Sequence, residues 1–286
     1  MDLITILITV AIMAVLGGLF GLALAFAGKV FEVKKDERIE KIIDALPGAN
    51  CGGCGYVGCE EYANAVVNNS AEINLCSVGG DETVDTLSII MGVYAEKKQR
   101  MHAQILCSGN YDCTKVKYDY AGLNDCVSVL KLGNGPKECP YGCIGLGTCA
   151  HVCPFDAIKI ENGVAQVEYE KCRACGICVN SCPQNIIKMV PFNSDVRVGC
   201  SSKDRGVVIR EYCDVGCIGC GICKKVCPEE AIEFSDNIAY IDYSKCTNCG
   251  ICVEKCPRNI IRSEKGHNNQ EDNYINNGVI GENGDI

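Results

Sequence analysis

Tryptophan is absent from this 286-residue chain, and aromatic residues make up only 6% of it. With so few large apolar side chains we expect no extensive hydrophobic core, and small domains of that kind depend on bound metal for stability. Positive charge is also scarce, since the formal net charge is −9 and the pI is about 5.0. A nucleic-acid surface needs clustered Lys and Arg, so we expect no nucleic-acid partner.

Two kinds of functional motif are missing as well. The chain has no glycine-rich dinucleotide fingerprint and no P-loop, so nothing predicts binding of NAD or of another nucleotide. The three histidines, His102, His151 and His267, show no paired spacing of the kind that metal ligands have. We therefore expect no catalytic residue on this chain.

The longest uncharged apolar run covers residues 3–28. As a helix it would be about 39 Å long, enough to cross a hydrocarbon core of about 30 Å. We expect a transmembrane helix at 1–28. A cleaved signal peptide is the alternative, with Ala-Phe-Ala at 25–27 as its cleavage site, although Asp2 stands where a basic segment is expected.

Basic residues follow this run, and none precedes it. They are Lys29, Lys34, Lys35, Arg38 and Lys41. By the positive-inside rule, the rest of the chain should lie on the cytoplasmic side of the cell membrane, which is a reducing compartment.

Further along the chain, residues 36–46 place apolar side chains at helical spacing, and Pro47-Gly48 should end that helix. A second helix is expected near 83–106. The tail, 264–286, is rich in Asn, Gly, Asp and Glu and is expected to be disordered.

What the chain has in abundance is cysteine, 25 residues of it. The spacing Cys-x2-Cys-x2-Cys recurs, and it points neighbouring thiols into one small volume. Disulfides do not need that arrangement, whereas a cluster of four irons does. The cysteines therefore predict [4Fe–4S] clusters.

An internal repeat organises most of these cysteines. The stretch from Cys139 to Pro154 aligns without gaps on the stretch from Cys213 to Pro228, an offset of 74 residues, and a second cysteine motif repeats at the same offset. Each copy has the pattern of a bacterial ferredoxin that holds two clusters. In that pattern three cysteines of one motif share a cluster with the fourth cysteine of the other.

The second copy is complete. Its expected ligand sets are Cys217, Cys220, Cys223 and Cys256 for one cluster, and Cys246, Cys249, Cys252 and Cys227 for its neighbour. Structural zinc is the alternative, but four-ligand zinc gives no reason for triple Cys-x2 repeats.

The first copy lacks one cysteine, because Leu146 aligns with Cys220. Cys139 is the nearest candidate to replace it, and a [3Fe–4S] centre is the alternative if it does not reach. The expected sets are Cys139, Cys143, Cys149 and Cys182 for one cluster, and Cys172, Cys175, Cys178 and Cys153 for the other.

Nearer the N-terminus lies a further group of four cysteines in a glycine-rich stretch: Cys51, Cys54, Cys59 and Cys76. Four cysteines suffice for one cluster, and the glycines allow the backbone to turn tightly around it. A zinc knuckle is the alternative. Five clusters are expected in all.

Five cysteines remain: Cys107, Cys113, Cys126, Cys200 and Cys213. A sixth cluster on Cys107, Cys113, Cys126 and Cys200 is one hypothesis. The other is that all five are free or buried thiols, because buried cysteine behaves as a small hydrophobic residue.

The N-terminal apolar run, then GANCGGCGYVGCEEYA, then the ferredoxin-like repeats together resemble the B subunit of the Rnf ferredoxin:NAD oxidoreductase, a membrane electron-transport complex, in its long form. The resemblance covers nearly the whole chain apart from the tail. It implies an iron–sulfur subunit that accepts electrons from reduced ferredoxin and passes them to membrane subunits, toward NAD, while Na⁺ or H⁺ is pumped. A ferredoxin-like subunit of a hydrogenase or formate dehydrogenase is the alternative, and a non-redox metal-storage protein is a third.

The predicted fold class is α+β, with one transmembrane helix, a small N-terminal [4Fe–4S] domain and two tandem dicluster ferredoxin-like domains. The expected boundaries are 1–28 for the helix, 29–92 for the N-terminal domain, 93–135 for a connecting segment, 136–192 and 213–263 for the two modules, 193–212 for a linker and 264–286 for the tail.

Overall fold

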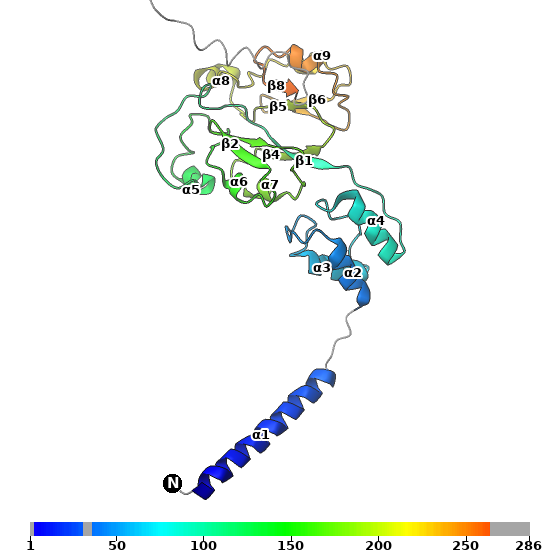
Figure 1. Cartoon of the computed structure of the whole chain (residues 1–286). Coiled ribbons are helices and arrows are strands. Elements are labelled where there is room, and N and C mark those ends of the chain that lie inside the picture. Colours follow the sequence, from blue (N-terminus) through cyan, green and yellow to red (C-terminus); the bar gives the residue numbers. More distant parts are fainter. Residues whose placement is uncertain (1–2, 31–35, 264–286) are drawn as a thin grey trace, which may run out of the picture.

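The first helix stands apart from the rest of the chain. The computed structural model describes residues 3–30 and 36–263, and α1 (Leu3–Val30) fills the first of these ranges (Figure 1). Within α1, Val10–Lys29 has a mean hydropathy of 2.4, and none of this stretch is buried inside the protein. By length and composition this helix could cross a membrane. The tail at 264–286, with His267, lies outside the described residues, as do Lys34 and Lys35.

Three helices build the N-terminal domain: α2 (Glu37–Ala45), α3 (Cys59–Val67) and α4 (Gly80–Met91). The helix expected at 36–46 is confirmed as α2, which begins after Asp36, whose side chain accepts a hydrogen bond from the backbone N–H of Arg38. Ile42 and Leu87 are fully buried where α2 and α4 meet.

The helix expected at 83–106 is wrong over its second half. α4 ends at Met91, because Gly92 caps it with φ +67°, in the left-handed region that favours glycine. Met101–Ile105 forms a strand, β1, which pairs antiparallel with β4 (Ile187–Pro191). Four of its five residues are buried, so long-range pairing and burial decide the structure of this segment.

The first ferredoxin-like module is therefore larger than expected. β1 and α5 (Cys126–Lys131), both in the predicted connecting segment, belong to it. The other elements are two short helices and a hairpin whose turn, Asn162-Gly163, has positive φ at both residues. They are α6 (Thr148–His151), β2 (Ile158–Glu161), β3 (Val164–Val167) and α7 (Ile177–Ser181).

The second module repeats this topology, with β5 paired to β8 and β6 paired to β7. The predicted linker is also structured, because β5 and α8 lie within it. The elements are β5 (Val196–Val198), α8 (Gly206–Tyr212), α9 (Ile222–Val226), β6 (Ile232–Ser235), β7 (Ile238–Ile241), α10 (Ile251–Glu254) and β8 (Ile261–Ser263).

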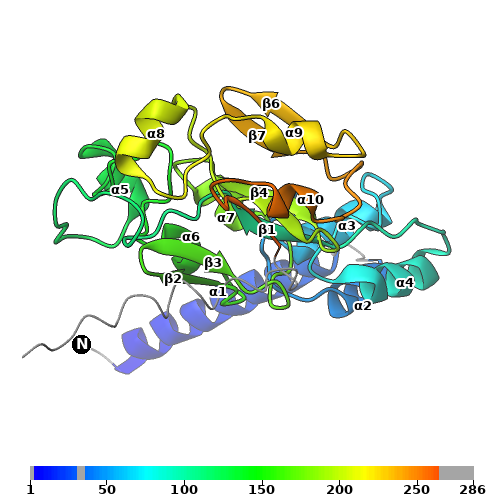
Figure 2. The ribbon, with the colours of Figure 1, turned by 90° about the horizontal axis from the view of Figure 1, so that it is seen from above.

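The two modules lie against each other (Figure 2). Arg197 on β5 donates a hydrogen bond to the carbonyl oxygen of Ile105 at the end of β1 (3.0 Å), and Tyr243 donates one to Oε1 of Gln104 (2.9 Å). Both cores contain cysteine beside Ile, Val and Ala. The side chains that would hold metal are thus also core residues.

Candidate metal centres

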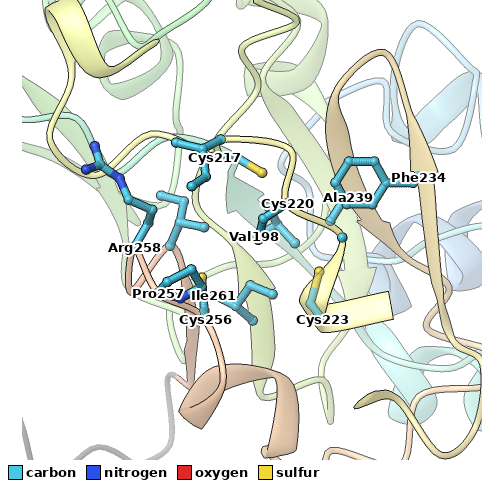
Figure 3. A pocket seen from close by; sticks show the side chains of 13 residues that line it. Val198, Cys217, Cys220, Cys223, Phe234, Ala239, Cys256, Pro257, Arg258 and Ile261 are labelled. Atoms are coloured by element: carbon cyan, nitrogen blue, oxygen red, sulfur yellow. The ribbon is translucent and has the colours of Figure 1, made fainter. Parts of the chain in front are cut away.

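A hollow in the second module is lined by the first four cysteines that the sequence grouped there, which we call the Cys217 set: Cys217, Cys220, Cys223 and Cys256. Figure 3 shows these side chains around one space, with Val198, Phe234 and Ile261 beside them. Gly219 and Gly221 have φ of +69° and +68°, so the backbone curls between successive cysteines into the first turn of α9. Burial is the main cause that raises the pKa of Cys223 to about 11, and the nearby Cys217 contributes to this shift.

The module's other four cysteines also interact with one another. These are Cys227, Cys246, Cys249 and Cys252, the Cys252 set. The pKa of Cys252 is raised to about 12, mainly by burial. The nearby thiols of Cys246 and Cys249, and of Cys223 in the Cys217 set, also contribute to this shift. The two sets are therefore close neighbours, and each draws its fourth cysteine from the other motif, as the ferredoxin pattern predicts.

In the first module, one of the two expected sets lines a single hollow. It is the Cys175 set, made of Cys153, Cys172, Cys175 and Cys178. Burial, followed by Cys172 and Cys175, raises the pKa of Cys178 to about 12. In a dry site crowded with sulfur, thiols resist ionisation unless a cation compensates the charge.

The other set of this module differs from the expected one. Its hollow is lined by the Cys149 set, which consists of Cys126, Cys143, Cys149 and Cys182. Cys126 lines this hollow in the place where the sequence predicted Cys139. The pKa of Cys149 is raised to about 12, mainly by burial, and the nearby thiols of Cys143 and Cys126 also contribute to this shift.

Cys126 reaches this hollow because hydrogen bonds join the start of α5 to the start of α6. Asp125 caps α5 through the backbone N–H of Ser128 (2.8 Å) and accepts a hydrogen bond from the Thr148 hydroxyl (2.9 Å). The same hydroxyl accepts one from the backbone N–H of Cys126 (2.7 Å). The one local signal in the sequence was Asp125 itself, a typical helix cap directly before a cysteine.

Cys139 lies instead in a separate hollow between the modules, lined by Cys107, Cys139, Cys200 and Cys213, the Cys200 set. This differs from the expected sixth set, because Cys139 and Cys213 take the places of Cys113 and Cys126. Cys113 lines none of these hollows, and its sulfur lies 2.9 Å from Oδ1 of Asn110.

The N-terminal domain brings its four cysteines around one hollow, as the sequence predicted. This is the Cys54 set: Cys51, Cys54, Cys59 and Cys76. Asn50, at φ +46°, turns the chain, and its side chain accepts a hydrogen bond from the backbone N–H of Cys59 at the start of α3 (2.8 Å). Burial raises the pKa of Cys76, and Cys54 adds to the shift.

The Cys54 set lies directly against the Cys175 set. A Cβ atom on Gly53 would come within 2.8 Å of the carbonyl oxygen of Cys175, and Ser77 donates a hydrogen bond to the carbonyl oxygen of Ala174 (3.2 Å). Burial raises the pKa of Cys175, and Cys51 from the other domain contributes. Only glycine at position 53 allows the two loops to approach this closely.

The described histidines take no part in these sets. His102 is buried in β1 with its ring 4.6 Å from that of Tyr169, and His151 ends α6.

Family models match the same regions. A model whose description names an Fe–S cluster matches residues 46–78. Models of the 4Fe–4S dicluster domain match residues 141–187 and 216–260, and a further match at 171–232 spans parts of both modules. Strand pairing places each of the first two dicluster matches within one module, and β1, β5 and β8 extend the modules beyond the matched residues.

Three named relatives match most of the chain. The B subunit of the Na(+)-translocating ferredoxin:NAD(+) oxidoreductase complex of Acetobacterium woodii is 45% identical, over 84% of this chain and 73% of the relative. The B subunit of the proton-translocating ferredoxin:NAD(+) oxidoreductase complex of Clostridium ljungdahlii is 38% identical, over 85% of this chain and 86% of the relative. The B subunit of the ion-translocating oxidoreductase complex of Methanosarcina acetivorans is 39% identical, over 83% of this chain and 90% of the relative. With this identity over most of their lengths, the chain belongs to the family of B subunits of ion-translocating ferredoxin:NAD(+) oxidoreductase complexes.

Proposed function

We propose that this chain accepts electrons from reduced ferredoxin and passes them to the membrane subunits of its complex, toward NAD. The observation that supports this most is the sequence of neighbouring cysteine sets. The Cys252 set adjoins the Cys217 set, the Cys149 set adjoins the Cys175 set through Cys178, and the Cys175 set adjoins the Cys54 set. Electron carriers need such closely placed centres, whereas a storage protein does not.

Each set suits an iron–sulfur cluster better than a zinc ion. The hollows lined by the Cys54, Cys175, Cys149, Cys217 and Cys200 sets have similar volumes, 330 to 380 Å³ including their open mouths, and the cysteines of the Cys252 set neighbour one another. Among the described residues no three Cys, His, Asp or Glu side chains converge closely enough for a single metal ion. Zinc would need its sulfur ligands at about 2.3 Å, whereas a cluster keeps its four thiolates farther apart. When bound, each cluster takes up and releases one electron.

Five sets accordingly receive one [4Fe–4S] cluster each in this proposal: the Cys54, Cys175, Cys149, Cys217 and Cys252 sets. The chain positions them, buries eight of their twenty cysteines, and directs backbone N–H groups at several sulfurs. Those hydrogen bonds, from residues such as Gly219 to Cys217, tune cluster potentials.

Electrons should enter at the second module and leave at the N-terminal domain. Cys220 and Cys249 are the two exposed cysteines of the chain, and both belong to the second module, where a soluble donor can approach. The Cys54 set follows α1 by about two dozen residues and so lies nearest the membrane subunits.

Titration of the anaerobically purified chain with reduced ferredoxin tests this function. We expect bleaching of cluster absorption and paramagnetic signals from several centres, because the exposed cysteines offer an entry point. Iron and acid-labile sulfide should reach at least about 20 each per chain. Twelve or fewer irons in fully loaded protein, or metal that ferredoxin does not reduce, would contradict the proposal.

We also propose that α1 anchors the chain in the cell membrane with the modules on the cytoplasmic side, since the basic residues follow the helix. Tyr94, which is 91% exposed between α4 and β1, offers a labelling position. A Tyr94→Cys variant should resist an impermeant thiol reagent on intact cells and react after permeabilisation. Labelling of intact cells at the permeabilised level would refute this orientation.

A further inference from the structure

Four cysteines from four separate segments meet where the two modules touch. Cys107 follows β1, Cys139 precedes the first cysteine motif, Cys200 follows β5, and Cys213 follows α8. All four lie outside the family matches at 141–187 and 216–260, each of which falls within one module, although the match at 171–232 covers Cys200 and Cys213. The first module contributes Cys107 and Cys139, and the second contributes the other two.

The walls of this hollow are built around sulfur. A Cβ atom on Gly142 would lie 3.3 Å from the sulfur of Cys139 and 3.5 Å from that of Cys107. One on Gly109 would lie 3.5 Å from the sulfur of Cys213 and 3.8 Å from that of Cys107. Glycine at both positions keeps side chains out of the space between the thiols. The bare backbone can then approach, as it does around the Cys217 and Cys54 sets.

Hydrogen-bond donors also point at the sulfurs. The Thr114 hydroxyl lies 3.7 Å from the sulfur of Cys213, and the backbone N–H of Ser202 lies 3.5 Å from that of Cys200. Thr114 itself is buried, and its backbone bridges to Cys213 across the module boundary. Donors of this kind stabilise thiolates and sulfides.

A buried lysine supplies positive charge to the same hollow. Lys137 is only 3% exposed, and its ammonium donates to the carbonyl oxygens of Gly109 (2.7 Å), Cys143 (3.0 Å) and Gly163 (2.6 Å). Only a charged ammonium has three protons to donate. Burying that charge among neutral carbonyls is costly, and a nearby anion would compensate it. Cys143 belongs to the Cys149 set, so Lys137 lies between that set and the hollow.

The hollow also lies between the two modules' own sets. Burial is the main cause that raises the pKa of Cys143 to about 11, and the nearby Cys107 contributes to this shift. Burial likewise raises the pKa of Cys200 to about 12, with Cys217 and Cys107 contributing. The Cys200 set therefore neighbours the Cys149 set on one side and the Cys217 set on the other.

We propose that Cys107, Cys139, Cys200 and Cys213 hold a sixth [4Fe–4S] cluster that connects the two modules. This inference rests on the proposed electron-transfer function, in which the cluster accepts one electron from the Cys217 side and gives it to the Cys149 side. Reduced ferredoxin remains the source of that electron. Lys137 is a positioning residue that sets the local charge.

Native mass spectrometry of the intact loaded chain gives the first test, which needs no variant. We expect about 24 irons and about 24 sulfides, four of each for every set. A fully loaded chain with about 20 irons would overturn the sixth cluster. So would one zinc ion bound in addition to those 20 irons.

A Cys200→Ala variant tests the assignment, and Cys113→Ala is its matched control, because Cys113 is a nearby cysteine outside every set. We expect Cys200→Ala to lose about four irons and one paramagnetic centre, and Cys113→Ala to lose none. Unchanged iron in folded Cys200→Ala protein would overturn the proposal. If ferredoxin reduces nothing even in the parental chain, the electron-transfer function fails, whereas the iron loss would still show the site.

Rapid-mixing experiments separate a bridge from a side branch. In Cys200→Ala protein, ferredoxin should still reduce the second module at the parental rate, while reduction of the first module and N-terminal centres should slow at least about tenfold. Parental rates at all centres would overturn the bridging role.

A Lys137→Met variant should keep its iron but lower the midpoint potential of the bridging centre, and an unchanged potential would refute the role of Lys137.

Discussion

Replacement of Cys54 by alanine is expected to reduce ferredoxin-dependent NAD reduction by the assembled complex to background. The change removes one thiolate from the Cys54 set, which is the proposed exit toward the membrane. The Cys217 and Cys252 sets keep all their ligands, so ferredoxin should still reduce them. Activity of membranes that contain the complex, measured together with the paramagnetic signals of the reduced chain, checks both parts of this expectation.

Cys113→Ala again provides the control, since it removes one sulfur that belongs to none of the sets. A Ser77→Ala variant adds a milder change, because it removes only the hydrogen bond to Ala174 that joins the N-terminal domain to the first module. The Ser77→Ala variant should modestly slow electron transfer from the first module to the N-terminal domain. If folded Cys54→Ala protein demonstrably lacks the cluster and still sustains the parental rate, the N-terminal centre is structural and the proposed route fails.

Replacement of Cys126 by alanine is expected to remove one centre from the first module, or to convert it to a three-iron form, and to slow electron transfer at least about tenfold. Cys126 is the fourth cysteine around the hollow that also contains Cys143, Cys149 and Cys182. A Cys139→Ala variant should leave this centre intact and affect the bridging centre instead. Paramagnetic spectra with iron analysis distinguish the two.

A second-site change makes this test stricter. Leu146 occupies the position at which the second module has Cys220, and it packs in the same cluster as Cys126. Leu146→Cys added to Cys126→Ala should therefore restore four thiolates and most of the lost activity. Loss of the centre in Cys139→Ala rather than in Cys126→Ala would return the assignment to Cys139.

Spacing along the chain predicted those cysteine sets whose members lie within short motifs. In Cys217-x2-Cys220-x2-Cys223 the thiols are a few residues apart, so local backbone turns at glycine bring them together wherever the segment lies. The same holds for α2, whose buried Ile42 follows from helical periodicity, and for α1, whose apolar length is a property of the sequence alone. The family could also be recognised, because its motifs are local.

Only the tertiary structure decided the places of Cys126, Cys139, Cys107, Cys200 and Cys213. These cysteines lie far apart in sequence, and no periodicity relates them. Cys126 is carried to its hollow by the contact of Asp125 with Thr148, and Cys107 by the pairing of β1 with β4. Nearness in sequence favoured Cys139 as the missing ligand, but pairing and packing between distant segments determine which thiols share a hollow. The segment that forms β1 shows the same effect, since burial and pairing with β4 in the first module made a strand where a helix was expected.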